Sequence, residues 1–380
     1  MEGSEVKNFA MVWTAVWASL SYCYFLGKIV QKGALRFMSI LPVVCLFLLL
    51  PLNLTSIHLG GITAFFVAWL ANFKLLLFAF GRGPLASTDP PLSLSRFAAV
   101  ACLPIKIRRD PTSQSAQKHQ IEIDQSQKPN PYPQIPKKSH KWILNYGTKG
   151  LLLGLLLRLY DYSDQFHPKL LLFLYCFHVY FCLELILVLV ATLARTTLGM
   201  ELEPQFREPY LSSSLQDFWG RRWNIMVSSI LRPTVYEPVR AGSTRIVGRK
   251  WASLPAVFST FVVSALMHEL IFFYLGRVPP TWEITWFFLL HGACLVAEIV
   301  AKKSFARGWR LPRLVTGLLT VGFVMVTGFW LFFPQLLRCR GDVRALEEYA
   351  AVAEFARSSL LGLTRAFTAT AKPYNATSVS

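Results

Sequence analysis

Apolar residues run through this chain in long stretches that are separated by polar segments. A helix needs about 20 apolar residues to cross the hydrocarbon core of a bilayer. Stretches near that length lie at residues 9–27, 37–53, 60–80, 143–160, 168–194, 251–276, 282–301 and 312–334. Lys74 and Lys149 interrupt the third and the fourth of them. The pattern predicts an all-α fold, a polytopic transmembrane helical bundle of about eight spans.

The polar segments divide the chain into four parts. Residues 1–105 hold the N-terminal spans, and their last 15 residues, 91–105, are too short to span and are expected to lie in the interface or to re-enter. Residues 106–142 are rich in Gln, Ser, Pro and Lys, which is typical of a disordered, basic cytosolic linker. Residues 143–334 form the second group of spans. The tail, residues 335–380, contains one amphipathic helical pattern, expected to be interfacial, at Leu346, Tyr349, Val352, Ala353 and Phe355.

The distribution of charge along the chain predicts how these spans are oriented in the membrane. Lys and Arg number 39 against 21 Asp and Glu, a net charge of +18, yet only 16% of residues are charged and 53% are hydrophobic. A nucleic-acid partner is therefore disfavoured, because such proteins carry dense basic residues. Lys and Arg fall in the loops after the first, third, fifth and seventh spans. The positive-inside rule places these loops in the cytosol and both termini on the far side, together with the sequons at Asn53 and Asn375.

The seven cysteines lie mostly inside apolar stretches and form no CxxC pair. They are expected to be buried, reduced thiols with no metal framework. The first apolar stretch has neither a basic segment before it nor a small-residue cleavage site after it, so we interpret it as a retained span.

Three of the seven histidines, His178, His268 and His291, lie inside predicted spans. An ionisable group at membrane depth suggests function, although a hydrogen bond to a neighbouring helix explains it equally. His178 has no carboxylate on its face, whereas His291 shares a face with Glu298 and is predicted to form a structural pair with it. His268 has Ser264 one turn back on the same face and is a candidate general base for a hydroxyl substrate. From spacing alone, both interpretations of His268 remain open.

Residues 212–224, SSSLQDFWGRRWN, form a second segment with many candidate functional residues. Ser213 and Gln216 have capping-box spacing, so a short helix is predicted to begin there. On that helix Asp217 and Arg221 form an i,i+4 pair.

The same helix carries Trp219 and Trp223 along one stripe, and Gly220 lies one turn before Asn224, where its missing side chain leaves room for a group to approach. An interfacial aromatic belt with snorkelling arginines would give the same composition. The density of basic residues also suits a phosphorylated ligand from the cytosol, because Arg binds phosphate in a bidentate manner. These basic residues are Arg221, Arg222, Arg232, Arg240, Arg245, Arg249 and Lys250.

Motifs of other enzyme classes are absent or misplaced. His119 and Asp124 have the HxxxxD spacing of soluble-domain glycerolipid acyltransferases, but they lie in the polar linker, where no packed site could hold them. The sequence has no GxSxG, HHxxxDG or GxxxxGK motif and no metal-ligand cluster. A serine esterase, a bacterial-type wax synthase, a P-loop motor and a zinc enzyme are therefore disfavoured.

Four blocks of sequence together are far more specific than any single motif. They are WLANFKLLLFAFGRGPL at 69–85, PQFREPYLSSSLQDFWGRRWNIMVSSILRPTVYEPV at 204–239, SALMHELIFFYLGR at 264–277 and LHGACLVAE at 290–298. With them, nearly the whole chain apart from the linker and tail resembles the plant wax synthase family, a branch of the membrane-bound O-acyltransferases (MBOAT). That family includes long-chain-alcohol O-fatty-acyltransferases, acyl-CoA sterol O-acyltransferases and, further off, a diacylglycerol acetyltransferase.

The resemblance implies an MBOAT-like fold, a catalytic core at 143–334, and acyl-CoA as co-substrate with no cofactor and no metal. The family's intramembrane histidine matches His268 and its asparagine matches Asn224. His268 would take the proton of an alcohol that attacks the thioester, and Asn224 would orient the donor or stabilise charge at the carbonyl. Arg207 departs from the asparagine expected before Glu-Pro-Tyr, which puts only the local turn in doubt.

Basic residues of the loop at 195–250 would hold the CoA phosphates on the cytosolic face. The candidate substrate-binding residues are Asp217, Trp219, Arg221, Arg222, Trp223 and Ser264.

Two other function classes compete with this interpretation. A transporter also has interrupted spans and intramembrane histidines, but its interrupted helices commonly occur in two related halves, whereas the polar signal here is concentrated in one loop and the following helix. A non-catalytic scaffold would not need Asn224 and His268 together.

Two acceptors, a long-chain alcohol and a sterol, are compatible with the sequence. LRPTVYEP suggests the sterol branch, while FYLGR and LHGAC fit alcohol-using members equally. The narrow preference is for a long-chain alcohol in the lipid of the endoplasmic reticulum membrane, with a sterol as the close alternative.

Overall fold

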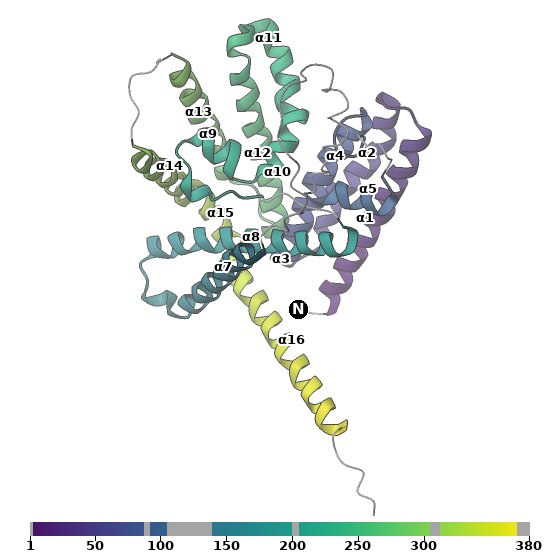
Figure 1. The fold of residues 1–380 in the computed structure, drawn as a ribbon, viewed down its shortest axis with the longest axis vertical. Helices are drawn as coiled ribbons and strands as arrows, with labels where there is room; N and C mark the ends of the chain where they lie inside the picture. The colour runs from purple at the N-terminus through teal and green to yellow at the C-terminus, as the bar shows by residue number, and fades with distance from the viewer. Residues whose placement is uncertain (1–2, 87–91, 105–138, 200–204, 305–311, 371–380) are drawn as a thin grey trace, which may run out of the picture.

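A computed structural model describes residues 3–86, 92–104, 139–199, 205–304 and 312–370. These residues form helices and turns, with no strand among them, which confirms the all-α prediction (Figure 1). Most of the predicted polar linker lies outside the described residues.

Seven helical stretches in the described part of the chain are long and apolar enough to cross a membrane. They are Ser4–Ile29, Ala34–Asn53, Ile57–Ala79, Pro168–Leu198, Ser253–Gly276, Glu283–Ser304 and Arg313–Arg338. The eighth predicted span, residues 143–160, forms helix α7 (Ser139–Leu159) but is not among the seven. Lys149 and Arg158 with several polar neighbours lower its hydropathy, so seven of the eight predicted spans have the length and composition of a span in the described part of the chain.

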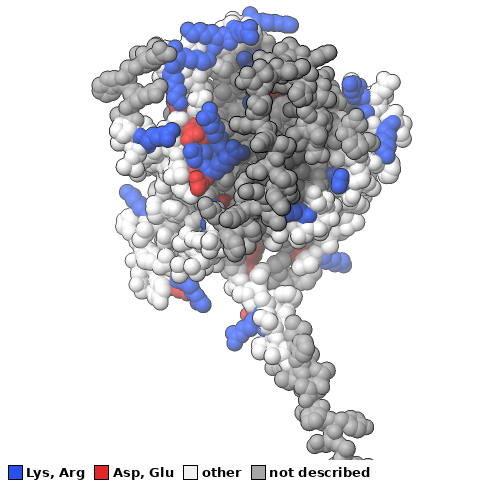
Figure 2. Space-filling model, in the orientation of Figure 1, with Lys and Arg blue, Asp and Glu red and all other residues white. Residues whose placement is uncertain are grey.

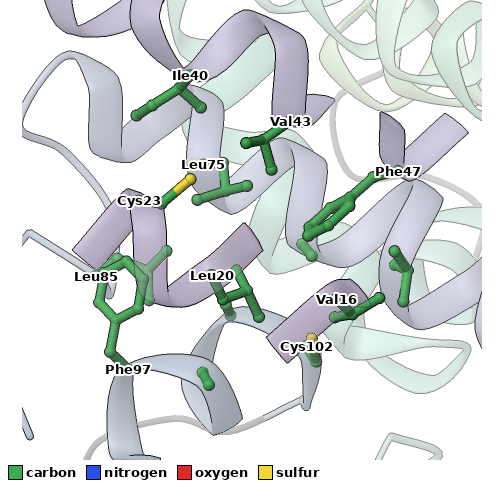
Figure 3. Close-up of a cluster of buried hydrophobic side chains, with 14 of the residues drawn as sticks. Val16, Leu20, Cys23, Ile40, Val43, Phe47, Leu75, Leu85, Phe97 and Cys102 are labelled. Carbon is green, nitrogen blue, oxygen red and sulfur yellow. The ribbon is translucent and has the colours of Figure 1, made fainter. Parts of the chain in front are cut away.

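The N-terminal helices enclose the larger apolar core of the molecule (Figure 3). They are α1 (Gly3–Ile29), α2 (Ala34–Leu49), η1 (Leu50–Asn53), α3 (Ile57–Thr63), η2 (Ala64–Ala71), α4 (Asn72–Ala79) and α5 (Leu94–Cys102). Leu20 and Cys23 of α1 meet Phe47 of α2, Leu75 of α4 and Phe97 of α5 in one cluster of buried side chains. This packing joins four helices of the N-terminal group into one unit.

Lys74 of α4, which interrupts the third predicted span, is buried, and its side chain reaches the C-terminal end of α5. Its Nζ donates hydrogen bonds of 2.6 Å to the carbonyl oxygens of Val100 and Leu103. A cation at a helix C-terminus is favourable, because the last carbonyl groups of the helix have no partner within it. The short segment predicted to re-enter is thus a nine-residue helix tied to the bundle by the charge that interrupts the neighbouring span.

The lysine that interrupts the fourth stretch is also paired. Helices α7 and α8 (Pro168–Leu198), joined by η3 (Tyr160–Gln165), form a hairpin in the lower half of Figure 1. Lys149 of α7 and Glu184 of α8 form a buried ion pair with an N–O distance of 2.6 Å. The hairpin is therefore closed by a charge pair that is shielded from lipid.

The C-terminal half contains a closely packed helix pair. Its elements are η4 (Pro209–Leu211), α9 (Leu215–Asp217), η5 (Phe218–Arg222), α10 (Ile225–Leu231), η6 (Arg232–Tyr236), α11 (Glu237–Trp251), α12 (Ser253–Gly276), α13 (Glu283–Ser304), α14 (Arg313–Thr327), η7 (Gly328–Phe332) and α15 (Phe333–Arg338). Helices α12 and α13 approach so closely that a Cβ on Gly292 would lie 2.9 Å from the Cβ of Phe261. Only a residue without a side chain fits there.

Helix α16 (Gly341–Thr370) extends away from the bundle at the lower end of Figure 1 and confirms the helix predicted in the tail. Its first turns are tied to α3, since Glu348 accepts hydrogen bonds from the backbone N–H groups of Ile57 and His58 and from the hydroxyl of Ser56. Tyr349 bonds both His58 and His178, at 2.9 and 3.1 Å. His178 thus takes part in the docking of α16. Its membrane association stays a prediction.

Several helix ends divide as the charge pattern predicts. The α1–α2 turn, the tip of α11 and the facing ends of α13 and α14 lie toward the upper side of Figure 1, whereas α16 and the N-terminus lie toward the lower side. Lys and Arg side chains line the upper edge of the molecule (Figure 2). Which of the two sides is cytosolic stays a prediction.

Gly292→Ala should lower the stability of the protein by about 1–3 kcal/mol, because the added methyl group overpacks the contact with Phe261. The matched control is Gly322→Ala in α14, where an added Cβ meets nothing within 4 Å and where alanine should be neutral or stabilising by up to about 1 kcal/mol. Thermal unfolding in detergent measures both. Equal effects of the two substitutions would contradict the close approach of α12 and α13.

Candidate active site

A cavity of about 350 Å³ lies between the segment at 216–236, α12 and α13. Its walls come from parts of the sequence that the chain brings together only in three dimensions. The lining residues are Gln216, Trp219, Gly220, Trp223, Asn224, Val227, Ser228, Leu231, Arg232, Tyr236, Val257, Thr260, Phe261, Ser264, His268, Phe288, Leu295 and Ile299. Both predicted catalytic residues, His268 and Asn224, are among them.

The imidazole of His268 is held by its own helix. Nδ1 lies 2.7 Å from the carbonyl oxygen of Ser264, one turn back on α12. A carbonyl oxygen can only accept, so Nδ1 donates and carries the proton of the neutral ring, and Nε2 is left as an acceptor. The ring packs against Phe288, with centroids 4.2 Å apart, and edge-on against Trp69 at 5.1 Å. The arrangement leaves one basic nitrogen in a lining residue of the cavity.

Asn224 reaches the same cavity from a strained turn. Its backbone adopts φ 42° and ψ 65°, a left-handed conformation that asparagine tolerates better than most residues. It caps α10, and its Oδ1 accepts a hydrogen bond of 3.4 Å from the N–H of Val227. With the oxygen used for the cap, the Nδ2 amide group is the donor that remains for a ligand.

The short helix before Asn224 begins one residue later than predicted. Ser214, and not Ser213, is the cap, because its hydroxyl oxygen accepts a hydrogen bond of 3.1 Å from the N–H of Asp217. The predicted capping box of Ser213 and Gln216 is therefore wrong. Gln216 lines the cavity instead.

The pairings along this segment follow a wider helical turn than predicted. Asp217 pairs with Arg222 at 2.8 Å, and not with Arg221. Phe218 stacks on Trp223, with centroids 5.5 Å apart and planes at 13°, in place of the predicted stripe of Trp219 and Trp223. The reason is that η5 is π-helical, so residues five apart lie above one another and the i,i+4 register does not apply.

The predicted substrate-binding residues separate into two groups. Trp219, Trp223 and Ser264 line the cavity, whereas Asp217, Arg221 and Arg222 do not. Arg222 also donates to the backbone carbonyls of residues 207 and 208, so it closes the loop. Arg221 is exposed. No three His, Cys, Asp or Glu side chains of the described chain are placed to hold a metal ion.

Comparison with known proteins connects this cavity with a chemistry. A model of the membrane bound O-acyl transferase family matches residues 202–290, a range that contains Asn224 and His268. Acyl-CoA–sterol O-acyltransferase 1 of Arabidopsis thaliana is 47% identical over 351 residues, 92% of this chain and 96% of that protein. The long-chain-alcohol O-fatty-acyltransferase of Simmondsia chinensis is 46% identical over 362 residues, 94% and 98% of the two chains. The chain belongs to the membrane-bound O-acyltransferase family.

The protein is therefore an acyltransferase, and with its seven apolar helices it is an integral, multi-pass membrane protein. The departure at Arg207 lies where the observed contacts are made by the backbone. Residue 207 bonds Arg222 through its backbone, with its N–H donating to the carbonyl of Arg222 at 3.0 Å and its own carbonyl accepting from the guanidinium at 3.1 Å. Backbone contacts of this kind do not depend on the side chain.

Several cavity residues were not predicted from the sequence. Val257, Thr260 and Phe261 continue the face of α12 on which Ser264 and His268 lie. The spacing of three and four residues back from Ser264 is a signal that could have identified them. Phe288 and Leu295 of α13 and Tyr236 of η6 come from separate elements, and no local pattern connects them with His268. Arg232 of η6, which also lines the cavity, was among the basic residues predicted to suit a phosphorylated ligand.

The predicted pair of His291 and Glu298 is wrong. His291 is buried and bonds Thr327 through Nε2 at 2.8 Å, whereas Glu298 bonds Lys302 at 2.5 Å and the backbone N–H of Leu215 at 2.9 Å. Residues seven apart share a helix face but are about 10 Å apart along the axis, too far for a hydrogen bond. Glu298 instead anchors the start of α9 to α13.

Arg222→Gln should destabilise the segment at 205–231 by about 1–3 kcal/mol, because it removes a charged hydrogen-bond partner of the partly buried Asp217. The matched control is Arg221→Gln, at an exposed neighbour, with an expected effect within about 0.5 kcal/mol. The rate of protease cleavage within this segment in native membranes measures the difference. Faster cleavage with Arg221→Gln alone would contradict the Asp217–Arg222 pair and support the predicted i,i+4 pair of Asp217 and Arg221.

Proposed function

We propose that this acyltransferase moves a fatty acyl group from acyl-CoA to the hydroxyl of a long-chain alcohol and forms a wax ester in the endoplasmic reticulum membrane. The observation that carries the proposal is the meeting of His268 and Asn224 at one cavity, in an imidazole tautomer that leaves Nε2 as an acceptor. The family of the chain supplies the reaction class.

In this scheme His268 is the general base. Nε2 accepts the proton of the alcohol as its oxygen attacks the thioester carbonyl, and the CoA thiolate leaves. The bond from Nδ1 to the carbonyl of Ser264 keeps the ring orientation and stabilises the imidazolium that forms. The thioester is already activated, so neither a covalent acyl-enzyme nor a cofactor is required.

Asn224 supplies the complementary charge. Its Nδ2 group donates to the carbonyl oxygen of the thioester, which gains negative charge during the attack. The cap bond to Val227 and the left-handed backbone orient the amide before substrate arrives. A donor that is already oriented needs little reorganisation in the reaction.

The donor's CoA portion would enter beside η6 and α11. Arg232 and Tyr236 line the cavity, and Arg232 is exposed and has only a loose ion pair, at 3.5 Å, with the exposed Glu237. Exposed basic residues continue along α11 toward the upper edge in Figure 2. They are Arg240, Arg245, Arg249 and Lys250. A path of this charge attracts the CoA phosphates.

The choice of a long-chain alcohol is supported by the shape of the apolar wall. Val257 and Phe261 are one turn apart on α12, and Leu295 and Ile299 are one turn apart on α13. Two such rows along neighbouring helices suit an extended chain. A sterol remains the second candidate, because the sterol-acylating relative matches this chain as well as the alcohol-acylating one does.

His268→Ala should abolish ester formation, a loss of about 10²–10⁴-fold, because general-base catalysis contributes on that scale. The matched control is Leu266→Ala, at an exposed position on the same helix, which should leave activity near normal. Ester formation is measured in isolated membranes with equal amounts of inserted protein. Normal turnover after His268→Ala would overturn the proposed role.

In a yeast strain that lacks its own sterol ester and triglyceride synthesis, the protein should produce wax esters when fatty alcohol is supplied. The reason is that the cavity accepts a linear chain between α12 and α13. Lipid extraction and mass analysis identify the ester, with His268→Ala as the inactive control. Sterol esters without wax esters would reverse the choice of acceptor.

A further inference from the structure

Two buried polar nitrogens next to the cavity have no hydrogen-bond partner in the part of the chain that the structure describes. They are Nε1 of Trp219 and Nδ1 of His291, and Nε1 of Trp69, which contacts His268 from the other side, is a third. Buried polar groups are rarely left without a partner, because each such group costs desolvation free energy. The rings of Trp219 and His291 are in contact, with centroids 5.4 Å apart and planes at 67°. The first two unpartnered atoms thus belong to neighbouring side chains.

The bonds of Thr327 show that these two nitrogens are complementary. The Thr327 hydroxyl donates to the carbonyl oxygen of Phe323 at 2.7 Å, so its oxygen is the acceptor in the 2.8 Å contact with Nε2 of His291. Nε2 therefore carries the proton of the neutral ring, and Nδ1 is an acceptor. An indole N–H can only donate. Trp219 has a donor without an acceptor, and His291 has the matching acceptor without a donor.

The position of Trp219 connects this pair with the reaction. Trp219 lines the cavity and packs edge-on against Phe261 at 5.6 Å and tilted against Phe288 at 5.9 Å. Phe288 in turn contacts the ring of His268, with centroids 4.2 Å apart. The orientation of the indole therefore sets the aromatic wall on which the imidazole of His268 rests.

We propose that His291 is a positioning residue, whose Nδ1 accepts a hydrogen bond from Nε1 of Trp219 when acyl-CoA fills the cavity. The inference rests on the proposed function for the identity of the ligand. A rotation of the indole about its side-chain torsions closes the bond, and Thr327 keeps the imidazole in the tautomer that can accept it. The closed pair fixes the cavity wall beside His268 for the chemical step.

Two substitutions of His291 separate this role from simple packing. Asn places an amide atom near the former Nδ1 and preserves an acceptor for Trp219, whereas Gln places its amide near the former Nε2 and preserves only the bond to Thr327. His291→Gln should lower kcat/KM for acyl-CoA about tenfold, the effect of one buried donor left unpaired. His291→Asn should stay within about threefold of the unmodified protein.

The two substitutions His291→Asn and His291→Gln are then measured in a Trp219→Phe background, where the indole N–H is missing. The difference between Asn and Gln should disappear there, whereas a packing effect would persist. Equal losses with Asn and Gln in the unmodified background, or a difference that survives Trp219→Phe, would overturn the proposal. All variants are compared at equal amounts of membrane-inserted protein.

A second measurement keeps the test independent of turnover. The ultraviolet resonance Raman signal of Trp219, obtained as the difference between the full-length protein and Trp219→Phe, reports whether its N–H is bonded. A non-reactive acyl-CoA analogue should shift this signal to the bonded form in the unmodified protein but not in His291→Gln, and an unchanged signal would overturn the inference. Absence of ester formation by the unmodified protein would instead overturn the proposed function.

Discussion

Polar groups at membrane depth must find their partners inside the protein, because lipid offers none. Most of the fold obeys this constraint through pairs that join distant helices. Lys74 satisfies the last carbonyls of α5, Lys149 neutralises Glu184, and His178 bonds the helix that leaves the bundle. Each charge that weakens a span in the sequence thus fixes the position of a neighbouring element. The charged residues that interrupt these spans are used for contacts between helices, so they do not indicate a transport path.

Around the cavity the same constraint is relaxed. His268 keeps an acceptor and Asn224 keeps a donor after their structural bonds are made, and Trp219 and His291 each keep an atom without a partner. A binding site must hold such unused groups in reserve, because the ligand is what satisfies them. His178 bonds tyrosine hydroxyls through both ring nitrogens, whereas His268 and His291 each form a hydrogen bond through one ring nitrogen among the described residues. These contacts separate the three histidines more clearly than spacing along the helix does.

The sequence predicted the elements whose length is set by the bilayer or whose side-chain spacing follows the ordinary α-helical period. The bilayer sets the length of each span, so seven of the eight predicted spans are found in the described part of the chain, and α7 was overestimated because its apolar half resembles a span. The face of α12 with Ser264 and His268 also follows from an ordinary helical period. The pairings predicted for the segment at 213–223 were wrong for a physical reason. A π-helical turn needs tertiary packing to be stable, so its five-residue register is not encoded in local spacing.

The position of Trp69 shows why the two halves of the chain form one enzyme. It lies on η2 of the N-terminal group, is buried, and contacts the ring of His268 on α12. The same stretch begins at α3, whose first N–H groups are capped by Glu348 of α16. The imidazole is therefore held between an N-terminal tryptophan and Phe288 of α13, and neither contact is visible from its own helix. The tautomer of His268 is set by α12, but the placement of its ring depends on elements from both halves of the chain.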